Sequence, residues 1–163
     1  MLPMVCRVAD RVIEKTEQAL MMYHRLVLVV GASGVGKTNV LKEVSSRVAA
    51  PLVNVNLELS RRMLDLTERQ RLLELPRILS EIVDAVASNH DIVLLDNIEI
   101  LFDASLKRDP LGLLQQLSRY KTVVAAWNGR IDDGYLVYAV PGHSEFRRYP
   151  LKDFLFVDLN ADM

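Results

Sequence analysis

The sequence predicts an α/β fold, a three-layer sandwich in which helices cover both faces of a mostly parallel five-stranded sheet. Two observations lead to this class. Apolar runs with strand character alternate with segments of helical periodicity along most of the chain. A glycine-rich loop also separates the first apolar run from the helical pattern that follows it. In sheets of this kind, ligands bind at the carboxyl ends of the strands.

The predicted helices each carry apolar residues at helical spacing. They cover residues 3–23, 37–49, 77–87 and 110–120. A charge-dense stretch at residues 60–75 is helical in part, and we expect a turn or kink after it at Pro76 because proline interrupts a helix. The first of these helices precedes the first strand and packs against the core, with an oligomer or partner contact as the alternative.

The five predicted strands of the main sheet cover residues 25–30, 51–57, 92–95, 122–127 and 154–159. The first is continuously apolar, which is typical of a parallel strand buried on both faces. After the fourth strand, Asn128 and Gly129 turn the chain, and residues 135–140 form a small added strand. Because the sequence ends at Met163, we expect no C-terminal lid domain after the last strand.

Length and charge limit the organisation further. A domain typically takes about 100–150 residues, so residues 1–163 are predicted to form a single domain, with residues 1–24 as an N-terminal helix and residues 25–163 as the core. A net charge of −1 gives no basic surface for autonomous DNA binding. The arginine-rich stretch at residues 61–77 is a local exception to this charge balance.

Cysteine and histidine usage excludes two kinds of site. The single Cys6 cannot form an internal disulfide, and His24, His90 and His143 lack the spacing of zinc ligands. The apolar N-terminal stretch contains charges that fit neither a signal peptide nor a membrane-spanning helix. We therefore expect a cytoplasmic protein without membrane contact.

The loop GASGVGKT at residues 31–38 fits the phosphate-loop pattern. Gly34 and Gly36 let the backbone turn so that its N–H groups converge on phosphates, Lys37 adds a positive charge near the β and γ oxygens, and Thr38 supplies a hydroxyl for Mg²⁺. The positive end of the following helix points at the same anion. We therefore predict a P-loop NTPase sandwich that binds a nucleoside triphosphate together with Mg²⁺. The predicted nucleotide-binding residues are Gly31, Ala32, Ser33, Gly34, Val35, Gly36, Lys37 and Thr38.

A second motif is the apolar run that ends in Asp96. It resembles a Walker B strand, which delivers a carboxylate to the Mg²⁺ shell, so Thr38 and Asp96 are the predicted metal ligands. The alternative is an ordinary carboxylate at a strand end. In the additional-strand P-loop ATPases that this pattern resembles, the next residue is usually a glutamate that polarises the attacking water, whereas this chain has Asn97.

Three residues are the candidate catalytic groups, namely Lys37, Glu99 and Asn128. If the chain turns helically after Asp96, Glu99 returns to the side of the metal ligand and can act as the base. The alternative is a carboxylate that interacts with a helix dipole. Asn128 follows the fourth strand, where such ATPases carry a polar residue called sensor 1 that contacts the γ-phosphate or the water, although turn formation alone also explains Asn-Gly.

Arg147 and Arg148 precede the last predicted strand. They are candidates for an arginine finger supplied in trans to a neighbouring subunit, with surface ion pairing as the alternative. Because no lid is expected, one face of the nucleotide site is left for a neighbour, and a homo-oligomer is predicted.

Four segments together resemble one family. They are residues 31–38, 60–82, 94–103 and 127–150, and they are similar to BrxF, the family of small P-loop proteins of type 3 BREX bacteriophage-exclusion systems. The resemblance spans nearly the whole chain. Because the phosphate loop is shared by a vast superfamily, it depends on LTERQR and on WNG…PGH…YRRYP-like segments, here with Phe146 ahead of Arg147.

This resemblance implies a bacterial defence component, related to lidless AAA+ ATPases, that acts as a nucleotide-dependent assembly or switch factor. It implies work with other BREX proteins, including a larger ATPase, a methyltransferase and a phosphatase-like protein, with DNA contacted only indirectly or within the complex. ATP rather than GTP is also inferred from the resemblance, since no guanine-reading motif is found. Hydrolysis is expected to be weak or to require assembly.

Two alternatives remain. A non-catalytic nucleotide-binding scaffold is favoured by Asn97 in place of glutamate. A small-molecule kinase suits the size and fold but needs a mobile, arginine-lined lid, for which residues 61–77 are a weak candidate.

Overall fold

A computed structural model describes residues 4–139 and 143–161. Its main sheet has five strands in the order β2-β3-β4-β1-β8, and every neighbouring pair is parallel. The strands are β1 Leu26–Gly31, β2 Leu52–Asn54, β3 Ile92–Asp96, β4 Thr122–Asn128 and β8 Leu155–Asp158. β4 is an additional strand between the phosphate-loop strand β1 and the carboxylate strand β3. The predicted α/β sandwich with its five-stranded parallel sheet is confirmed.

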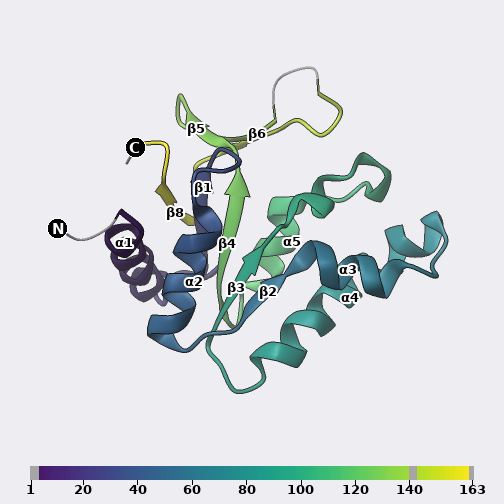
Figure 1. Cartoon of the computed structure of the whole chain (residues 1–163). Coiled ribbons are helices and arrows are strands. Elements are labelled where there is room, and N and C mark those ends of the chain that lie inside the picture. The colour runs from purple at the N-terminus through teal and green to yellow at the C-terminus, as the bar shows by residue number, and fades with distance from the viewer. Residues whose placement is uncertain (1–3, 140–142, 162–163) are drawn as a thin grey trace.

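Helices cover both faces of this sheet (Figure 1). The first layer contains α1 Met4–Ala19 and α2 Lys37–Val48. The other layer contains α3 Val55–Met63, α4 Glu68–Ala87 and α5 Pro110–Leu117, with the short 3₁₀ helices η1 Glu99–Phe102 and η2 Ala104–Leu106. The predicted N-terminal helix is confirmed, and it ends at Ala19 rather than Tyr23.

Strand β1 divides its side chains between two hydrophobic clusters. Leu26, Leu28 and Val30 pack on the side of α3, α4 and α5, whereas Val27 and Val29 pack on the side of α1 and α2. Side chains alternate between the faces of a strand, and all six residues of β1 are buried. This two-sided burial explains why the sequence shows a continuous apolar run before the phosphate loop.

Two predicted boundaries are wrong, for local reasons. The predicted strand at residues 51–57 stops at Asn54, because the Asn54 side chain accepts a hydrogen bond of 3.1 Å from the Leu57 N–H and caps α3. The turn predicted at Pro76 as one of two possibilities is also absent. Helix α4 starts at a capping box between Thr67 and Gln70 and runs through Pro76. Buried apolar residues on both sides of the proline hold it in the core, which offsets the missing hydrogen bond.

A second, antiparallel sheet lies beyond the carboxyl ends of the main strands, next to the loop between β1 and α2 (Figure 1). It consists of β5 Arg130–Asp132, β6 Tyr135–Tyr138 and β7 Arg147–Pro150. Asp133 and Gly134 join β5 to β6 with positive φ values of 50° and 81°, as a two-residue hairpin requires. The sequence predicted the central strand of this sheet but not its two partners, so the arrangement over the site was not foreseen.

Among the described residues, no helix combines the length and apolar character that a membrane-spanning helix needs.

Candidate functional site

The phosphate loop connects the end of β1 to the start of α2. Gly34 and Gly36 have φ values of 84° and 105°, in the left-handed region that glycine adopts without strain. Gly31 is required for a different reason, since a Cβ at this position would lie 2.6 Å from the Cγ2 of Val35. The glycines of the motif therefore shape a turn that delivers the chain to the N-terminus of α2, where backbone N–H groups are free to bind an anion.

Lys37 is folded back onto this loop. Its Nζ donates hydrogen bonds of 2.9 Å to the Gly31 carbonyl and 2.7 Å to the Ala32 carbonyl. The residue is only 7% exposed. Burial lowers the pKa of the Lys37 ammonium, and the carboxylates of Glu99 and Asp96 act in the opposite direction without cancelling the effect. A phosphate would offer this buried cation a stronger, charged acceptor than the two carbonyls.

Thr38 and Asp96 meet between α2 and β3. The Thr38 hydroxyl donates a 2.7 Å hydrogen bond to Oδ2 of Asp96, whose Oδ1 accepts a 2.9 Å hydrogen bond from the Asn97 N–H. One hydroxyl and one carboxylate fit Mg²⁺, which takes oxygen ligands and is usually held by one or two carboxylates together with substrate phosphates. The described part of the chain has no cluster of three or more His, Cys, Asp or Glu side chains, so a metal cage built from protein ligands alone is absent there.

The loop after Asp96 brings Glu99 back to the phosphate loop. Asn97 leaves β3 with a φ of 54°, a conformation that asparagine adopts more readily than most residues, and its carbonyl accepts a 3.0 Å hydrogen bond from the Asn56 N–H. Glu99 then starts η1. Its Oε1 accepts a hydrogen bond from the Asn128 side chain at the end of β4. Asn97, which stands where related ATPases usually have glutamate, thus occupies a left-handed backbone position that suits asparagine.

These groups surround one cavity of about 300 Å³, which we call the phosphate cavity. Its walls come from the phosphate loop, the N-terminus of α2 and the ends of β3 and β4. The lining residues are Ser33, Gly34, Gly36, Lys37, Thr38, Asn39, Asp96, Asn97, Glu99 and Asn128. The structure therefore brings together the residues predicted as catalytic and metal-binding, although they come from three separate segments of the sequence.

Asn160 is a residue of this region that the sequence analysis missed. It follows β8, and its Oδ1 accepts a 3.2 Å hydrogen bond from the Ala32 N–H while its Nδ2 donates a 3.2 Å hydrogen bond to the Gly129 carbonyl. The Gly129 N–H donates in turn to the Gly31 carbonyl at 3.0 Å. Asn160 thus connects the phosphate loop to the chain just after Asn128. Its position after a parallel strand was the available signal, since such strand ends meet at one edge.

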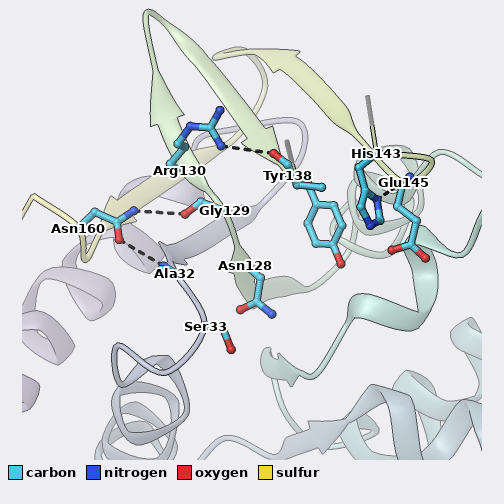
Figure 2. Close-up of a pocket in the computed structure, with 10 residues that line it drawn as sticks. Ala32, Ser33, Asn128, Gly129, Arg130, Tyr138, His143, Glu145 and Asn160 are labelled. Atoms are coloured by element: carbon cyan, nitrogen blue, oxygen red, sulfur yellow. Dashed lines mark hydrogen bonds between the residues drawn. The ribbon is translucent and has the colours of Figure 1, made fainter. Parts of the chain in front are cut away.

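A second cavity of about 620 Å³ adjoins the phosphate cavity, and both are lined by Ser33 and Asn128. We call it the canopy cavity because β5 and β6 of the small antiparallel sheet contribute Arg130 and Tyr138 to its wall (Figure 2). Its other lining residues are Ala32, Gly129, Arg130, Tyr138, Ala139, His143, Glu145 and Asn160. No local pattern predicts this cavity, because its walls come from the phosphate loop, the chain after β4, the end of β6, residues 143 and 145, and the chain after β8.

Arg147 and Arg148 lie on β7 rather than in a loop. Arg147 donates hydrogen bonds to the carbonyls of Phe146 at 3.2 Å and Arg108 at 3.5 Å. The Arg148 guanidinium lies 3.5 Å from the centroid of the Tyr135 ring. Neither arginine lines the phosphate cavity of its own chain.

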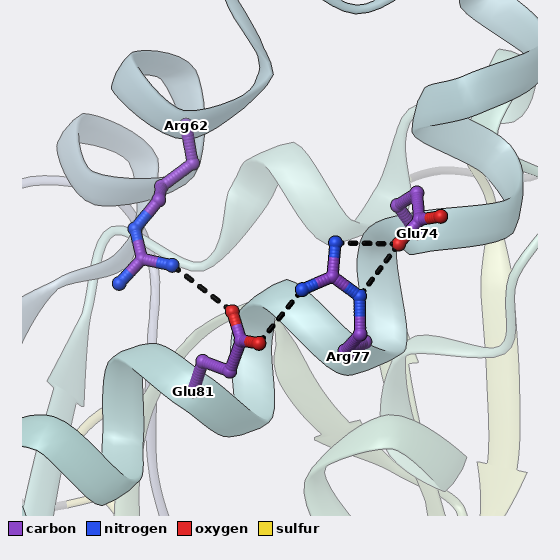
Figure 3. A network of polar contacts seen from close by, with 4 residues as sticks. All are labelled: Arg62, Glu74, Arg77 and Glu81. Atoms are coloured by element: carbon purple, nitrogen blue, oxygen red, sulfur yellow. Dashed lines mark hydrogen bonds and ion pairs between the residues drawn. The ribbon is translucent and has the colours of Figure 1, made fainter.

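Several arginines of residues 61–77 make contacts within or near α3 and α4. Figure 3 shows Arg62 and Arg77 converging on Glu81 at 3.2 and 2.7 Å, with Arg77 also 2.6 Å from Glu74. Arg71 donates instead to the carbonyls of nearby residues, including Met63 at 3.0 Å. Arg62 and Arg77 belong to a surface network between two helices, which argues against the weak prediction that this stretch forms a lid.

The chain is similar to one protein family and to solved structures. The sequence matches the ATPase family associated with various cellular activities (AAA) over residues 27–127, which is more than half of the chain. No curated protein sequence matches it. Among solved structures it is similar to PCH-2 of C. elegans, with a TM-score of 0.41 and 18% identity over 75% of this chain. The match covers 35% of PCH-2, so this chain spans about a third of that protein. On the family match and the phosphate loop it contains, the chain belongs to the AAA family of ATPases.

Proposed function

We propose that this AAA-family chain binds ATP with Mg²⁺ and serves as a nucleotide-dependent assembly or switch factor of a bacterial BREX anti-phage system. The observation that carries the nucleotide part is the phosphate cavity, in which Lys37, Thr38, Asp96, Glu99 and Asn128 converge. Each of these polar side chains is hydrogen-bonded within the protein. Binding of a triphosphate with its metal would exchange these internal partners for ligand atoms, and that exchange is the basis of a switch.

The residues have separate roles in this proposal. Lys37 neutralises phosphate charge, while Thr38 and Asp96 hold Mg²⁺, which would stabilise charge on the phosphate oxygens. Glu99 accepts a proton from the attacking water, and Asn128 holds the Glu99 carboxylate in place. Because the glutamate stands two positions later than in the usual motor pattern, we expect slow turnover that increases on assembly.

The test of the switch is size-exclusion chromatography with light scattering. Wild type and Lys37→Ala are compared with Mg²⁺ and an ATP analogue, with ADP, or without nucleotide, and Lys42→Ala on the exposed face of α2 is the matched control. We expect a larger species with the ATP analogue in wild type and Lys42→Ala only. The same species in all conditions would contradict nucleotide-gated assembly by this chain alone.

Assembly also gives Arg147 and Arg148 a role. We propose that one of them reaches the phosphate cavity of a neighbouring subunit, since β7 carries both at the edge of the small sheet. Mixing Arg147→Ala/Arg148→Ala protein with Lys37→Ala protein tests this. Because one partner keeps an intact cavity and the other intact arginines, mixed oligomers should recover part of the wild-type turnover, whereas a self-contained site would recover none.

The BREX assignment is supported by the LTERQR segment and the WNG to YRRYP-like region. In the fold, the first forms the capped start of α4 and the second supplies all three strands of the small sheet. Co-purification of the chain with the larger ATPase, the methyltransferase and the phosphatase-like protein of a type 3 BREX system, with and without ATP, tests the partners. If none co-purifies under any nucleotide condition, the BREX assignment fails and the nucleotide site stands by itself.

A non-catalytic scaffold is the second candidate function, and Asn97 favours it. Its left-handed conformation and its contact with Asn56 give this residue a structural role in place of a catalytic one. In a scaffold, ATP would stabilise the protein without being hydrolysed. Thermal unfolding that shifts equally with ATP and with a non-hydrolysable analogue, in the absence of phosphate release even after assembly, would favour the scaffold. The kinase alternative has less support, because Arg62 and Arg77 are paired within α3 and α4 rather than directed at the phosphate cavity.

A further inference from the structure

The canopy cavity contains two polar groups that the phosphate cavity does not use. Within the described residues, neither the hydroxyl of Tyr138 nor the carboxylate of Glu145 makes a hydrogen bond. In Figure 2 both groups lie on the same side of the cavity, across from Arg130, Gly129 and Asn160. One is a donor and the other is an acceptor. A cavity with an unused donor and an unused acceptor on one side is suited to a ligand edge that offers both.

The Tyr138 ring and the backbone of Glu145 are held in place by their surroundings. The Tyr138 ring stacks on Phe102 at a centroid distance of 3.6 Å and meets Trp127 edge to face at 6.1 Å. The His143 Nδ1 accepts a 3.1 Å hydrogen bond from the Glu145 N–H, which fixes the backbone that carries the carboxylate. Little side-chain entropy is therefore lost when a ligand contacts Tyr138.

Electrostatic effects keep the Tyr138 hydroxyl protonated, so that it remains a hydrogen-bond donor beside the Glu145 acceptor. Burial raises the pKa of the Tyr138 hydroxyl to about 12, with further contributions from the charges of Glu145 and Glu99. The hydroxyl therefore stays protonated and remains a donor at physiological pH. The negative charge nearby favours ligand N–H groups over a second anion.

We propose that the canopy cavity binds an amino-bearing nucleobase, with Glu145 accepting hydrogen bonds from its N–H groups and Tyr138 donating to a ring nitrogen or carbonyl. The inference rests on the proposed nucleotide binding of the neighbouring phosphate cavity. The volume of about 620 Å³ suits a nucleoside-sized ligand. The small side chains of Ala32 and Ala139 leave room for a planar ring.

Two sources of this base are consistent with the shared border at Ser33 and Asn128. The base can belong to the nucleotide whose phosphates bind at Lys37, or to a second nucleoside that occupies the canopy cavity beside it. Both have the same recognition chemistry, and calorimetric titration separates them. The ligands are AMP-PNP with Mg²⁺, inorganic tripolyphosphate with Mg²⁺, and adenosine added to protein saturated with AMP-PNP.

The variants are Tyr138→Phe and Glu145→Gln, because each keeps the shape of the side chain while changing its hydrogen bonding. Tyr120→Phe, an exposed residue at the other end of the sheet, is the matched control. We expect each variant to weaken base binding by roughly threefold to tenfold, the usual effect of one lost hydrogen bond. We expect the control to match wild type and tripolyphosphate to bind all four proteins equally.

The titrations identify the source and can overturn the proposal. Weaker AMP-PNP binding in the two variants assigns the base to the same nucleotide. Unchanged AMP-PNP binding with weaker adenosine binding assigns it to a second molecule. Unchanged binding of both ligands in both variants, or an equal loss for tripolyphosphate, overturns base recognition in this cavity. If wild type binds neither AMP-PNP nor tripolyphosphate, the nucleotide site itself fails.

Discussion

The phosphate cavity and the canopy cavity share two lining residues but differ in whether their key polar side chains already have hydrogen-bond partners. In the first, Lys37, Asp96 and Glu99 each have a hydrogen-bond partner from the protein. In the second, the Tyr138 hydroxyl and the Glu145 carboxylate have none among the described residues. A ligand entering the first must replace existing contacts, whereas one entering the second completes contacts that are missing. The first arrangement suits a change of state on binding, and the second suits selection of what binds.

The substitution Glu99→Gln is expected to have the largest effect, because it tests the proposed base in the phosphate cavity. The variant keeps an oxygen that can accept the Asn128 hydrogen bond, so the geometry should persist while the base is lost. We expect turnover to fall by roughly 100-fold to 10,000-fold, with ATP binding kept or tightened. Steady-state phosphate release and equilibrium binding measure the two effects. Glu14→Gln on the exposed side of α1 is the control. Turnover equal to wild type would show that Glu99 is not the base.

Asp96→Asn tests the metal side of the phosphate cavity. It removes the carboxylate charge while keeping an oxygen within reach of the Thr38 hydroxyl. We expect the Mg²⁺ concentration needed for half-maximal ATP binding to rise by at least about tenfold, since changes even to groups behind a metal ligand cost roughly 10-fold to 100-fold. A magnesium titration at fixed ATP provides the measurement, with Asp84→Asn on α4 as the control. An unchanged midpoint would assign Asp96 a structural role only.

Asn160→Ala tests the border between the cavities. The variant loses the contacts to the Ala32 N–H and the Gly129 carbonyl, and both cavities depend on that backbone. We expect AMP-PNP affinity to fall by roughly threefold to tenfold. Calorimetry compares it with Asn89→Ala, an exposed asparagine remote from the site. If affinity stays at the wild-type value, the three strand ends are held together without Asn160.

The smallest expected effect is a proton taken up on binding. Burial lowers the pKa of Lys37 below 10.5 in the free protein, and phosphates favour the charged ammonium and raise its pKa in the complex. At pH values between the pKa of Lys37 in the free protein and its higher pKa in the complex, binding takes up as much as one proton, and affinity falls as pH rises. Calorimetry in two buffers of different ionisation enthalpy detects the proton. Lys37→Ala should abolish the uptake, and uptake that persists in this variant would assign it to another group.

Much of the main fold could be predicted because each signal was local. The apolar run of β1 reports burial on both faces, and the loop glycines report the backbone angles of Gly34 and Gly36. The failures come from competition between neighbouring signals. Asn54 continues an alternating strand pattern yet caps α3, and Pro76 suggests a break that the capping box and buried face of α4 override.

The candidate site divides in the same way. Lys37, Thr38 and Asp96 belong to two short motifs, the phosphate loop and the Walker B-like strand, so their roles could be predicted from the local sequence. Asn160 and the canopy cavity depend on which strands become neighbours, and that information is spread from residue 31 to residue 160. Short strands such as β5 and β7 carry little periodicity, so the sheet they form could not be identified from pattern alone.

The small sheet is attached to the core in an unusual place. The chain enters it directly from β4 and leaves it toward β8, and these strands flank β1 on either side. The small sheet is therefore connected to the main sheet through β4 and β8, the two neighbours of the strand that carries the phosphate loop. A subunit or partner protein that binds the small sheet and shifts it would shift the ends of β4 and β8, which lie on both sides of β1. Binding at the small sheet can therefore be coupled to the phosphate loop through short connections.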